Sequence, residues 1–174
     1  MKTLIIYSSQ TGFTKKYAEW IAEEMGASCI TLKEAKKKNL QDYDNLVYGG
    51  WCCAGGVKGL KWLKEKLPSL HNKKIALFAV GASPLENNPE VLVALRNNFE
   101  PLETETIKGF YCPGGFNYDK MSMGSKLAMK MFISILKKNK NPTEQDKKMI
   151  EMISHSYDIS DKKYIEPIVQ FLQN

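Results

Sequence analysis

Hydroxyl side chains gather near the N-terminus, in the stretch Ser8-Ser9-Gln10-Thr11-Gly12-Phe13-Thr14. This stretch follows the apolar run Leu4–Tyr7 and precedes residues with helical spacing, so it joins an expected strand to an expected helix. The first turn of a helix has unpaired backbone N–H groups and a partial positive charge, and both favour a bound phosphate. The hydroxyls of Ser9, Thr11 and Thr14 add further donors. Capping of the helix by Thr11 or Gly12 is an equally good explanation at this point.

Other site signatures are missing from the sequence. The first loop contains a single glycine, Gly12, so it matches neither the dinucleotide fingerprint GxGxxG nor a Walker A loop. The cysteines form no CxxC pair, and the two histidines, His71 and His155, lie far from them in the chain. We therefore expect no metal site, no histidine in a cofactor loop and no catalytic acid or base. The cysteines fit reduced thiols better than a disulfide framework.

The composition is that of an ordinary globular chain. It has 174 residues, of which 43% are hydrophobic and 25% charged, and this length suits one domain spanning 1–174. We find no apolar run long enough for a membrane span and no signal peptide, so we expect a cytoplasmic protein. The net charge is +6, but the lysines are spread out and accompany no RNA-binding or recognition-helix pattern. We expect no nucleic-acid partner.

Strand and helix signals alternate along the chain. This alternation predicts an α/β fold, a three-layer doubly wound five-stranded parallel sheet, whose ligands bind beyond the carboxyl ends of the strands. The expected strands are Thr3–Ser8, Ala27–Leu32, Asn45–Gly50, Lys74–Gly81 and Thr106–Cys112. The expected helices are Thr14–Met25, Val57–Leu67, Pro89–Phe99, about 122–138, a short helix opened by Thr143, and Asp161–Leu172.

The first loop resembles the phosphate loop of the flavodoxin family, whose pattern is [ST]-x-T-G-x-T after the first strand. Ser9, Thr11, Gly12 and Thr14 occupy the specified positions. The resemblance implies the strand order 2-1-3-4-5 and FMN as cofactor. It also implies that the FMN phosphate is held by Ser9, Gln10, Thr11, Gly12, Phe13 and Thr14.

The same resemblance assigns roles to the loop after the third strand. Gly50, Trp51, Cys52, Cys53 and Ala54 would lie along the flavin ring, and Trp51 matches the aromatic residue that commonly stacks on it. A core tryptophan is the alternative, although a glycine-rich loop is a poor place for one. Cys52 and Cys53 could be a redox couple beside the flavin, but we expect them to be small loop-filling residues.

Two further loops complete the implied flavin site. Gly81, Ala82 and Ser83 match the second loop that flanks the flavin, where the resemblance implies contact through the backbone. Gly114 and Gly115 follow the fifth strand and are the last residues that we assign to the cofactor.

The chain departs from simple flavodoxins after the fifth strand. A helical insertion of about 117–158 precedes the last helix, and this arrangement is similar to the flavodoxin-type menaquinone-dependent protoporphyrinogen oxidases. The arginine-bearing motif of that subgroup is replaced here by Phe116-Asn117-Tyr118.

The inserted helix is amphipathic. Lys126, Lys130 and Lys137 lie opposite an apolar stripe, so the helix could rest on an anionic membrane. We expect instead that the stripe packs on the core of the protein, which is the more common role of such a face. The stripe consists of Leu127, Ala128, Met131, Phe132, Ile135 and Leu136.

The sequence thus predicts an FMN-binding redox protein, either an electron carrier or an oxidoreductase. Its partner would be a redox protein, a quinone or a small-molecule substrate. The positive net charge differs from typical acidic flavodoxins and favours acidic partners, so we expect an oxidoreductase rather than a carrier. The alternative is a non-redox binding protein that kept the fold and lost FMN.

Overall fold

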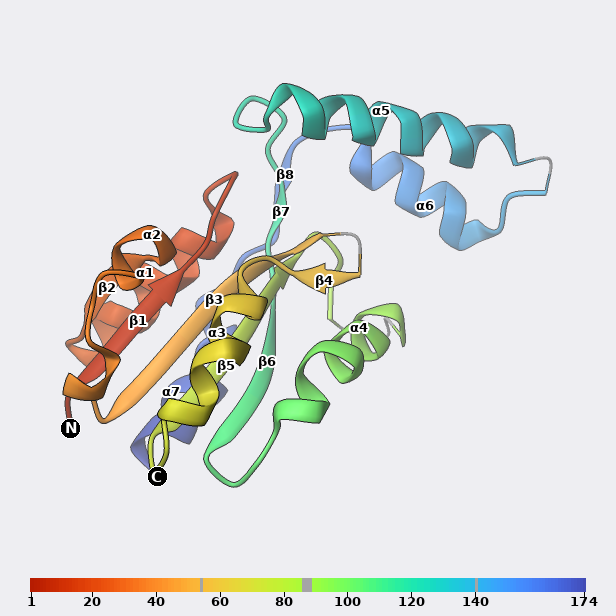
Figure 1. Cartoon of the computed structure of the whole chain (residues 1–174). Coiled ribbons are helices and arrows are strands. Elements are labelled where there is room, and N and C mark those ends of the chain that lie inside the picture. Colours follow the sequence, from red (N-terminus) through yellow and green to blue (C-terminus); the bar gives the residue numbers. More distant parts are fainter. Residues whose placement is uncertain (54, 86–88, 140) are drawn as a thin grey trace.

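The computed structural model describes residues 1–53, 55–85, 89–139 and 141–174 (Figure 1). Its main sheet has five parallel strands in the order β2-β1-β3-β5-β6. This is the expected order 2-1-3-4-5, counted over the five parallel strands alone. The strands are β1 Thr3–Tyr7, β2 Ser28–Thr31, β3 Asn45–Cys53, β5 Lys74–Gly81 and β6 Ile107–Pro113.

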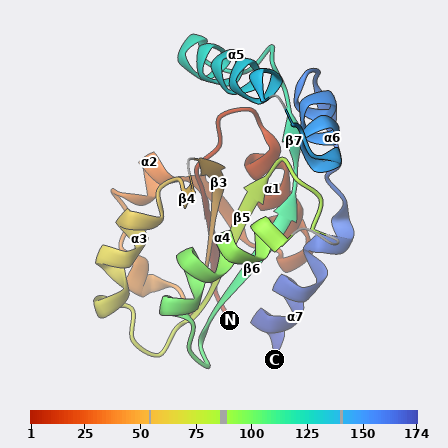
Figure 2. The same cartoon turned by 90° about the vertical axis from the view of Figure 1, so that its right-hand side faces the viewer.

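Helices cover both faces of this sheet and make three layers (Figure 2). One face carries α1 (Phe13–Met25) and α7 (Glu166–Gln173). The opposite face carries α2 (Leu32–Ala35), α3 (Leu60–Lys66) and α4 (Pro89–Phe99). In the described residues, short 3-10 turns lie between these elements at Leu40–Asp42, Leu67–Ser69, Glu100–Leu102 and Lys162–Tyr164.

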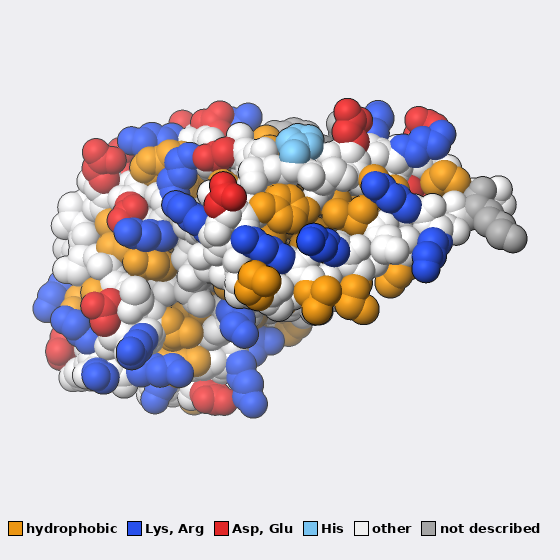
Figure 3. All heavy atoms as spheres, turned by 90° about the horizontal axis from the view of Figure 1, so that it is seen from above, with side chains coloured by type: hydrophobic (Ala, Val, Ile, Leu, Met, Phe, Trp, Pro, Cys, Tyr) orange, Lys and Arg blue, Asp and Glu red, His pale blue; other side chains and the backbone are white. Residues whose placement is uncertain are grey.

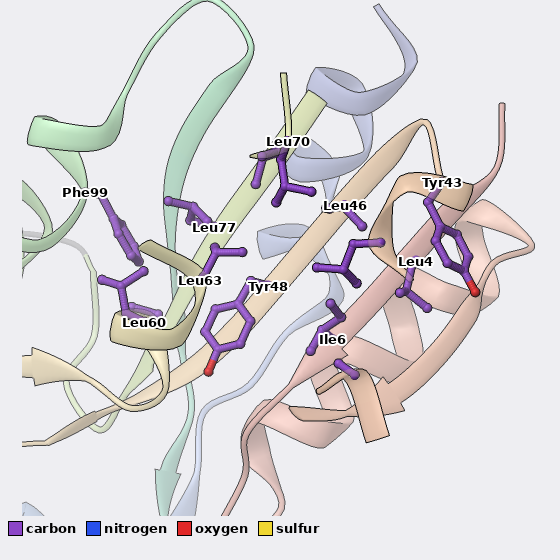
Figure 4. Packing of buried hydrophobic residues seen from close by; sticks show 14 of the residues in the cluster. Leu4, Ile6, Tyr43, Leu46, Tyr48, Leu60, Leu63, Leu70, Leu77 and Phe99 are labelled. Atoms are coloured by element: carbon purple, nitrogen blue, oxygen red, sulfur yellow. The ribbon is translucent and has the colours of Figure 1, made fainter. Parts of the chain in front are cut away.

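The core follows from the alternation of side chains along each strand. In β1, Leu4 and Ile6 face one layer of helices while Ile5 faces the other, and all three are fully buried. A parallel sheet with helices on both faces buries both sets, which explains the continuous apolar runs in the sequence. Figure 4 shows the larger of the two clusters, with Leu63 of α3 and Tyr48 of β3 on the same side of the sheet.

Several boundaries differ from the expectation. The third strand continues to Cys53, because it forms an antiparallel hairpin with β4 (Gly56–Val57) that pairs Cys52 with Val57. As a result, α3 begins only at Leu60, three residues later than expected. The last helix also begins later, at Glu166, because the residues before it form a 3-10 turn.

The insertion forms a separate arm, which we define as residues 115–158. Its base is a two-stranded antiparallel pair, β7 (Gly115–Phe116) with β8 (Tyr157–Asp158). Beyond the base lie α5 (Met123–Lys138) and α6 (Glu144–Ile153), which begins with the expected cap at Thr143. Figure 1 shows the arm projecting past the carboxyl ends of the main strands.

The apolar stripe of α5 does not pack on the core, so that expectation is wrong. The structure describes every residue of α5, and none of them is buried. The arm carries α5 away from the sheet, and most apolar side chains of the stripe remain exposed, with Leu127 at 61% and Ile135 at 65%. Seen from above, hydrophobic side chains and lysines lie side by side along the arm (Figure 3). Within the described part of the chain, no helix has the length and hydropathy needed to cross a membrane.

Candidate functional site

Hydrogen bonds from two backbone N–H groups hold the loop between β1 and α1 in one shape. The Ser8 N–H donates to the Gly49 carbonyl of β3 at 2.9 Å, and the Gly12 N–H donates to the Ser9 hydroxyl at 3.2 Å. Gly12 has a φ of +106°, a left-handed backbone conformation that residues other than glycine rarely adopt. Glycine is therefore needed where the loop turns into the helix.

The start of α1 is not capped by any side chain. Gly12 occupies the N-cap position, makes no side-chain hydrogen bond there, and no acidic residue stands in the first turn. The first N–H groups of a helix carry a partial positive charge and have no partner within the helix. Thr11 is therefore not the cap of this helix. Gly12 is the cap residue, but it has no side chain that could occupy the N–H groups, so the loop keeps the donors that a phosphate needs.

The end of β3 lies beside this loop. Gly50 is tightly enclosed, because a Cβ there would lie 2.4 Å from the Lys58 carbonyl oxygen. Trp51 is half-buried and pairs in register with Val80 of β5. Ala54, which we also assigned to the cofactor, lies outside the described residues.

Trp51, Cys52 and Cys53 are strand residues, and not residues of a glycine-rich loop as expected. Consecutive side chains of a strand point to opposite faces, so the Cys52 and Cys53 thiols point apart. Both cysteines are free and exposed, but the Cys52 residue also lines a cavity beside α4 that takes part of it away from water. Desolvation, with a smaller effect of Cys53, raises the pKa of the Cys52 thiol to about 11, so this thiol stays protonated at neutral pH. These features favour small structural residues over a redox couple.

Tyrosine hydroxyls fix the backbone after β5. Tyr111 of β6 donates to the Ser83 carbonyl oxygen at 2.7 Å, and Tyr157 of the arm donates to the Ala82 carbonyl oxygen, also at 2.7 Å. Desolvation raises the pKa of both phenols, so they stay protonated donors over the physiological range. The second expected flavin loop is thus held from two sides, one of them the arm.

Gly114 follows β6 and lies next to two other expected site segments, the β1–α1 loop at Phe13 and the end of β5 at Gly81. Its N–H donates to the Gly81 carbonyl oxygen at 2.7 Å. A Cβ on Gly114 would lie 2.7 Å from Val80 Cγ1 and 3.1 Å from Phe13 Cβ, so the position accepts only glycine without rearrangement. The next residue, Gly115, pairs with Asp158 at the base of the arm. The expected site segments therefore meet at one edge of the sheet.

A small cavity lies between the β3–β4 hairpin and α4. Its volume is about 190 Å³, and its lining includes Cys52, Val57, Ala79, Leu95 and Tyr111. Pockets for drug-sized ligands usually measure about 300–1,000 Å³. The cavity alone is therefore too small to identify a ligand.

Comparisons with known proteins agree with this geometry. Residues 4–143 match the family described as the flavodoxin domain. The chain is also 30% identical over 164 residues to the flavodoxin-like domain-containing protein BilS of Clostridioides difficile (strain CD3), covering 89% of this chain and 87% of that protein. The chain belongs to the flavodoxin family.

Solved structures of this family are also similar to the chain. A flavodoxin from the domain Archaea matches over 100% of both chains, with 14% identity and a TM-score of 0.46. A flavoprotein in complex with FMN from Lactobacillus acidophilus NCFM matches over 63% of this chain and 91% of its own, with 18% identity and a TM-score of 0.45.

In this flavodoxin-family chain, the arm reaches the β1–α1 loop. The Gln10 side-chain amide donates to the Ser125 hydroxyl of α5 at 3.1 Å. Lys16 of α1 forms an ion pair with Asp158 of β8 at 2.8 Å and donates to Ser160 at the same distance. Polar contacts therefore join the arm to the β1–α1 loop through Gln10 and to α1 through Lys16.

Sequence reasoning missed the residues that make these contacts. Ser125, Tyr157 and Asp158 lie more than 100 positions from the loop or in the inserted segment, and no local pattern marks them. Tyr111 was recognised only as part of a strand. His71 and His155 are exposed, as expected for residues outside the site.

Proposed function

We propose that this protein binds FMN and uses it in electron transfer. The observation that carries the proposal is the β1–α1 loop, where α1 of a flavodoxin-family chain begins with N–H groups that no side chain caps. A phosphate monoester carries nearly two negative charges, and such a nest can hold it without a cation of its own.

The residues present fit FMN. Ser9, Gln10, Thr11, Gly12, Phe13 and Thr14 would surround the phosphate, with the Ser9 hydroxyl holding the turn through Gly12. The ring would lie against Gly50, Trp51, Cys52 and Cys53 on one side and Gly81, Ala82 and Ser83 on the other. Gly114 and Gly115 would close the site, since Gly114 already lies against Phe13 and donates to the Gly81 carbonyl oxygen.

FMN, when bound, supplies the electron chemistry, and the chain supplies position and surroundings. Tyr111 and Tyr157 bind the carbonyls of Ser83 and Ala82, so the backbone of this loop is held in a fixed place. Fixed backbone dipoles next to the ring would set its reduction potential. The half-buried Trp51 would shield one side of the ring from water.

The exposed face of α5 gives a second part of the proposal, an anionic lipid surface as docking partner. Four lysines lie on α5, which has no acidic residue. Met123 and Met131 are exposed at 80% and 59%, and Leu127, Phe132 and Ile135 of the same helix are exposed as well. Apolar side chains beside lysines are typical of helices that lie in the lipid interface. The electron partner itself would be a redox protein, a quinone or a small molecule.

A flavin titration tests the cofactor assignment. The double variant Thr11→Val and Gly12→Ala removes a hydroxyl and forces a side chain into a left-handed position, so we expect FMN affinity to fall at least about tenfold. The matched control is Thr104→Val, which removes a hydroxyl in the turn before β6. Equal affinity of the double variant and the wild type would refute the loop assignment.

A further inference from the structure

We propose that Lys120 of the arm is a ligand of the FMN phosphate, so that the insertion completes the cofactor site. This inference rests on the proposed function, because it names an additional residue of the same site. The loop itself supplies neutral donors only, and the proposal adds one positive charge from a segment 108 positions away from Gly12 in the sequence.

Lys120 stands directly over the phosphate loop. Its ammonium group lies 3.9 Å from the point that a Cβ on Gly12 would occupy. Gly12 is the N-cap of α1, so the ammonium faces the place where the helix presents its unpaired N–H groups. A positive side chain beside positive backbone dipoles is unfavourable by itself, and a bound dianion would remove this repulsion.

The other lysines near the loop are engaged elsewhere. Lys15 forms an ion pair with Glu19 at 3.5 Å, and Lys16 forms one with Asp158 at 2.8 Å. Lys120 is exposed and takes part in no ion pair within the described part of the chain. Its charge is therefore available to a ligand.

The segment that carries Lys120 is held in place. The Lys120 N–H donates to the Asn117 side chain at 3.2 Å, and the Tyr118 N–H donates to the Ser156 hydroxyl at 3.0 Å. On its other side, Ser125 contacts Gln10 of the phosphate loop. These contacts place the Lys120 backbone on the arm without support from the Lys120 ammonium, so its removal should leave the fold intact.

Riboflavin is FMN without the phosphate, so comparing the two ligands shows whether Lys120 binds the phosphate or affects flavin binding in general. We would titrate the full chain with FMN and with riboflavin, using wild type, Lys120→Gln and Lys120→Arg. The matched control is Lys137→Gln, which removes an exposed lysine in the last turn of α5. Lys120→Gln should weaken FMN binding about tenfold, the loss expected for one charge-assisted hydrogen bond, and leave riboflavin binding unchanged.

The remaining variants should behave as follows. Lys120→Arg and Lys137→Gln should bind FMN as the wild type does, and the defect of Lys120→Gln should shrink at high salt. The inference is overturned if Lys120→Gln binds FMN normally, or if it loses FMN and riboflavin equally. Failure of the wild type to bind FMN would instead overturn the proposed function as well.

Discussion

The Tyr17 hydroxyl of α1 donates to the Pro113 carbonyl oxygen at the end of β6, 2.6 Å away, and accepts from the Asp161 N–H at 3.1 Å. Tyr17 is fully buried, and desolvation raises the pKa of its phenol. The Tyr17 side chain thus connects α1 to Pro113, just before the arm, and to Asp161, just after it. The position of Gly114, next to Pro113, depends on this junction.

Tyr17→Phe should destabilise the protein by about 1–3 kcal/mol, because the carbonyl and the N–H would lose their partner inside the protein. Urea unfolding followed by circular dichroism measures this loss. Tyr43→Phe is the matched control, since the described residues give the Tyr43 hydroxyl no hydrogen-bond partner. Equal stability of the two variants would show that the Tyr17 junction is unimportant.

The Lys16–Asp158 contact predicts a pH dependence of the arm. Burial alone would raise the pKa of Asp158, but hydrogen bonds from Lys16 and Ser160 outweigh it and lower the pKa. A lowered folded pKa means that the contact stabilises the fold above the ordinary carboxylate range and is lost as the pH falls through the folded value. We therefore expect the arm to loosen in acid.

Carbon NMR of the Asp158 carboxyl group tests this expectation. The wild type should titrate below the ordinary value of 3.8, and Lys16→Gln should move the titration upward. Lys15→Gln is the matched control and should change nothing, because Lys15 pairs with Glu19 instead. An ordinary pKa in the wild type would contradict the contact.

The cysteines should differ in reactivity. Cys112 is fully buried, and burial raises its pKa, so alkylation should reach it only after unfolding. In a Cys53→Ser variant, Cys52 should react slowly at neutral pH, because its pKa is about 11. Mass spectrometry of the alkylated peptides measures both rates. A Cys52–Cys53 disulfide in the native protein would contradict the strand geometry.

The face of α5 should bind anionic vesicles. Co-sedimentation should be strong with anionic lipid and weak with neutral lipid, and replacing Lys126, Lys130 and Lys137 by Gln should abolish it. A matched triple replacement of Lys36, Lys37 and Lys38, which directly follow α2, should leave it unchanged. Absence of binding, or equal loss in both triple variants, would count against a lipid partner.

Much of the fold could be predicted because local patterns specify it. The apolar strands, the glycine stop at Gly26 and the cap at Thr143 each depend on neighbouring residues only. The β3–β4 hairpin was missed because two short segments pair around Gly55, whose φ of +79° no periodicity reveals. The exposure of α5 was missed because an amphipathic pattern does not say what its apolar face contacts.

The candidate site also has a part that the sequence predicts and a part that it does not. The residues from Ser9 to Thr14 are contiguous and carry their own pattern, so the sequence alone indicated them. Lys120, Ser125 and Tyr157 lie far along the chain from the residues that they approach, and only the fold brings them together. Their residue types are ordinary, and without the fold nothing distinguishes them from other surface residues.

The most direct test of the central claim is a visible absorption spectrum of the purified protein, before and after addition of FMN and removal of the excess. We predict a yellow protein whose flavin bands shift on binding, with about one FMN per chain. A colourless protein that does not retain FMN would contradict the account and favour a binding protein that has lost the cofactor.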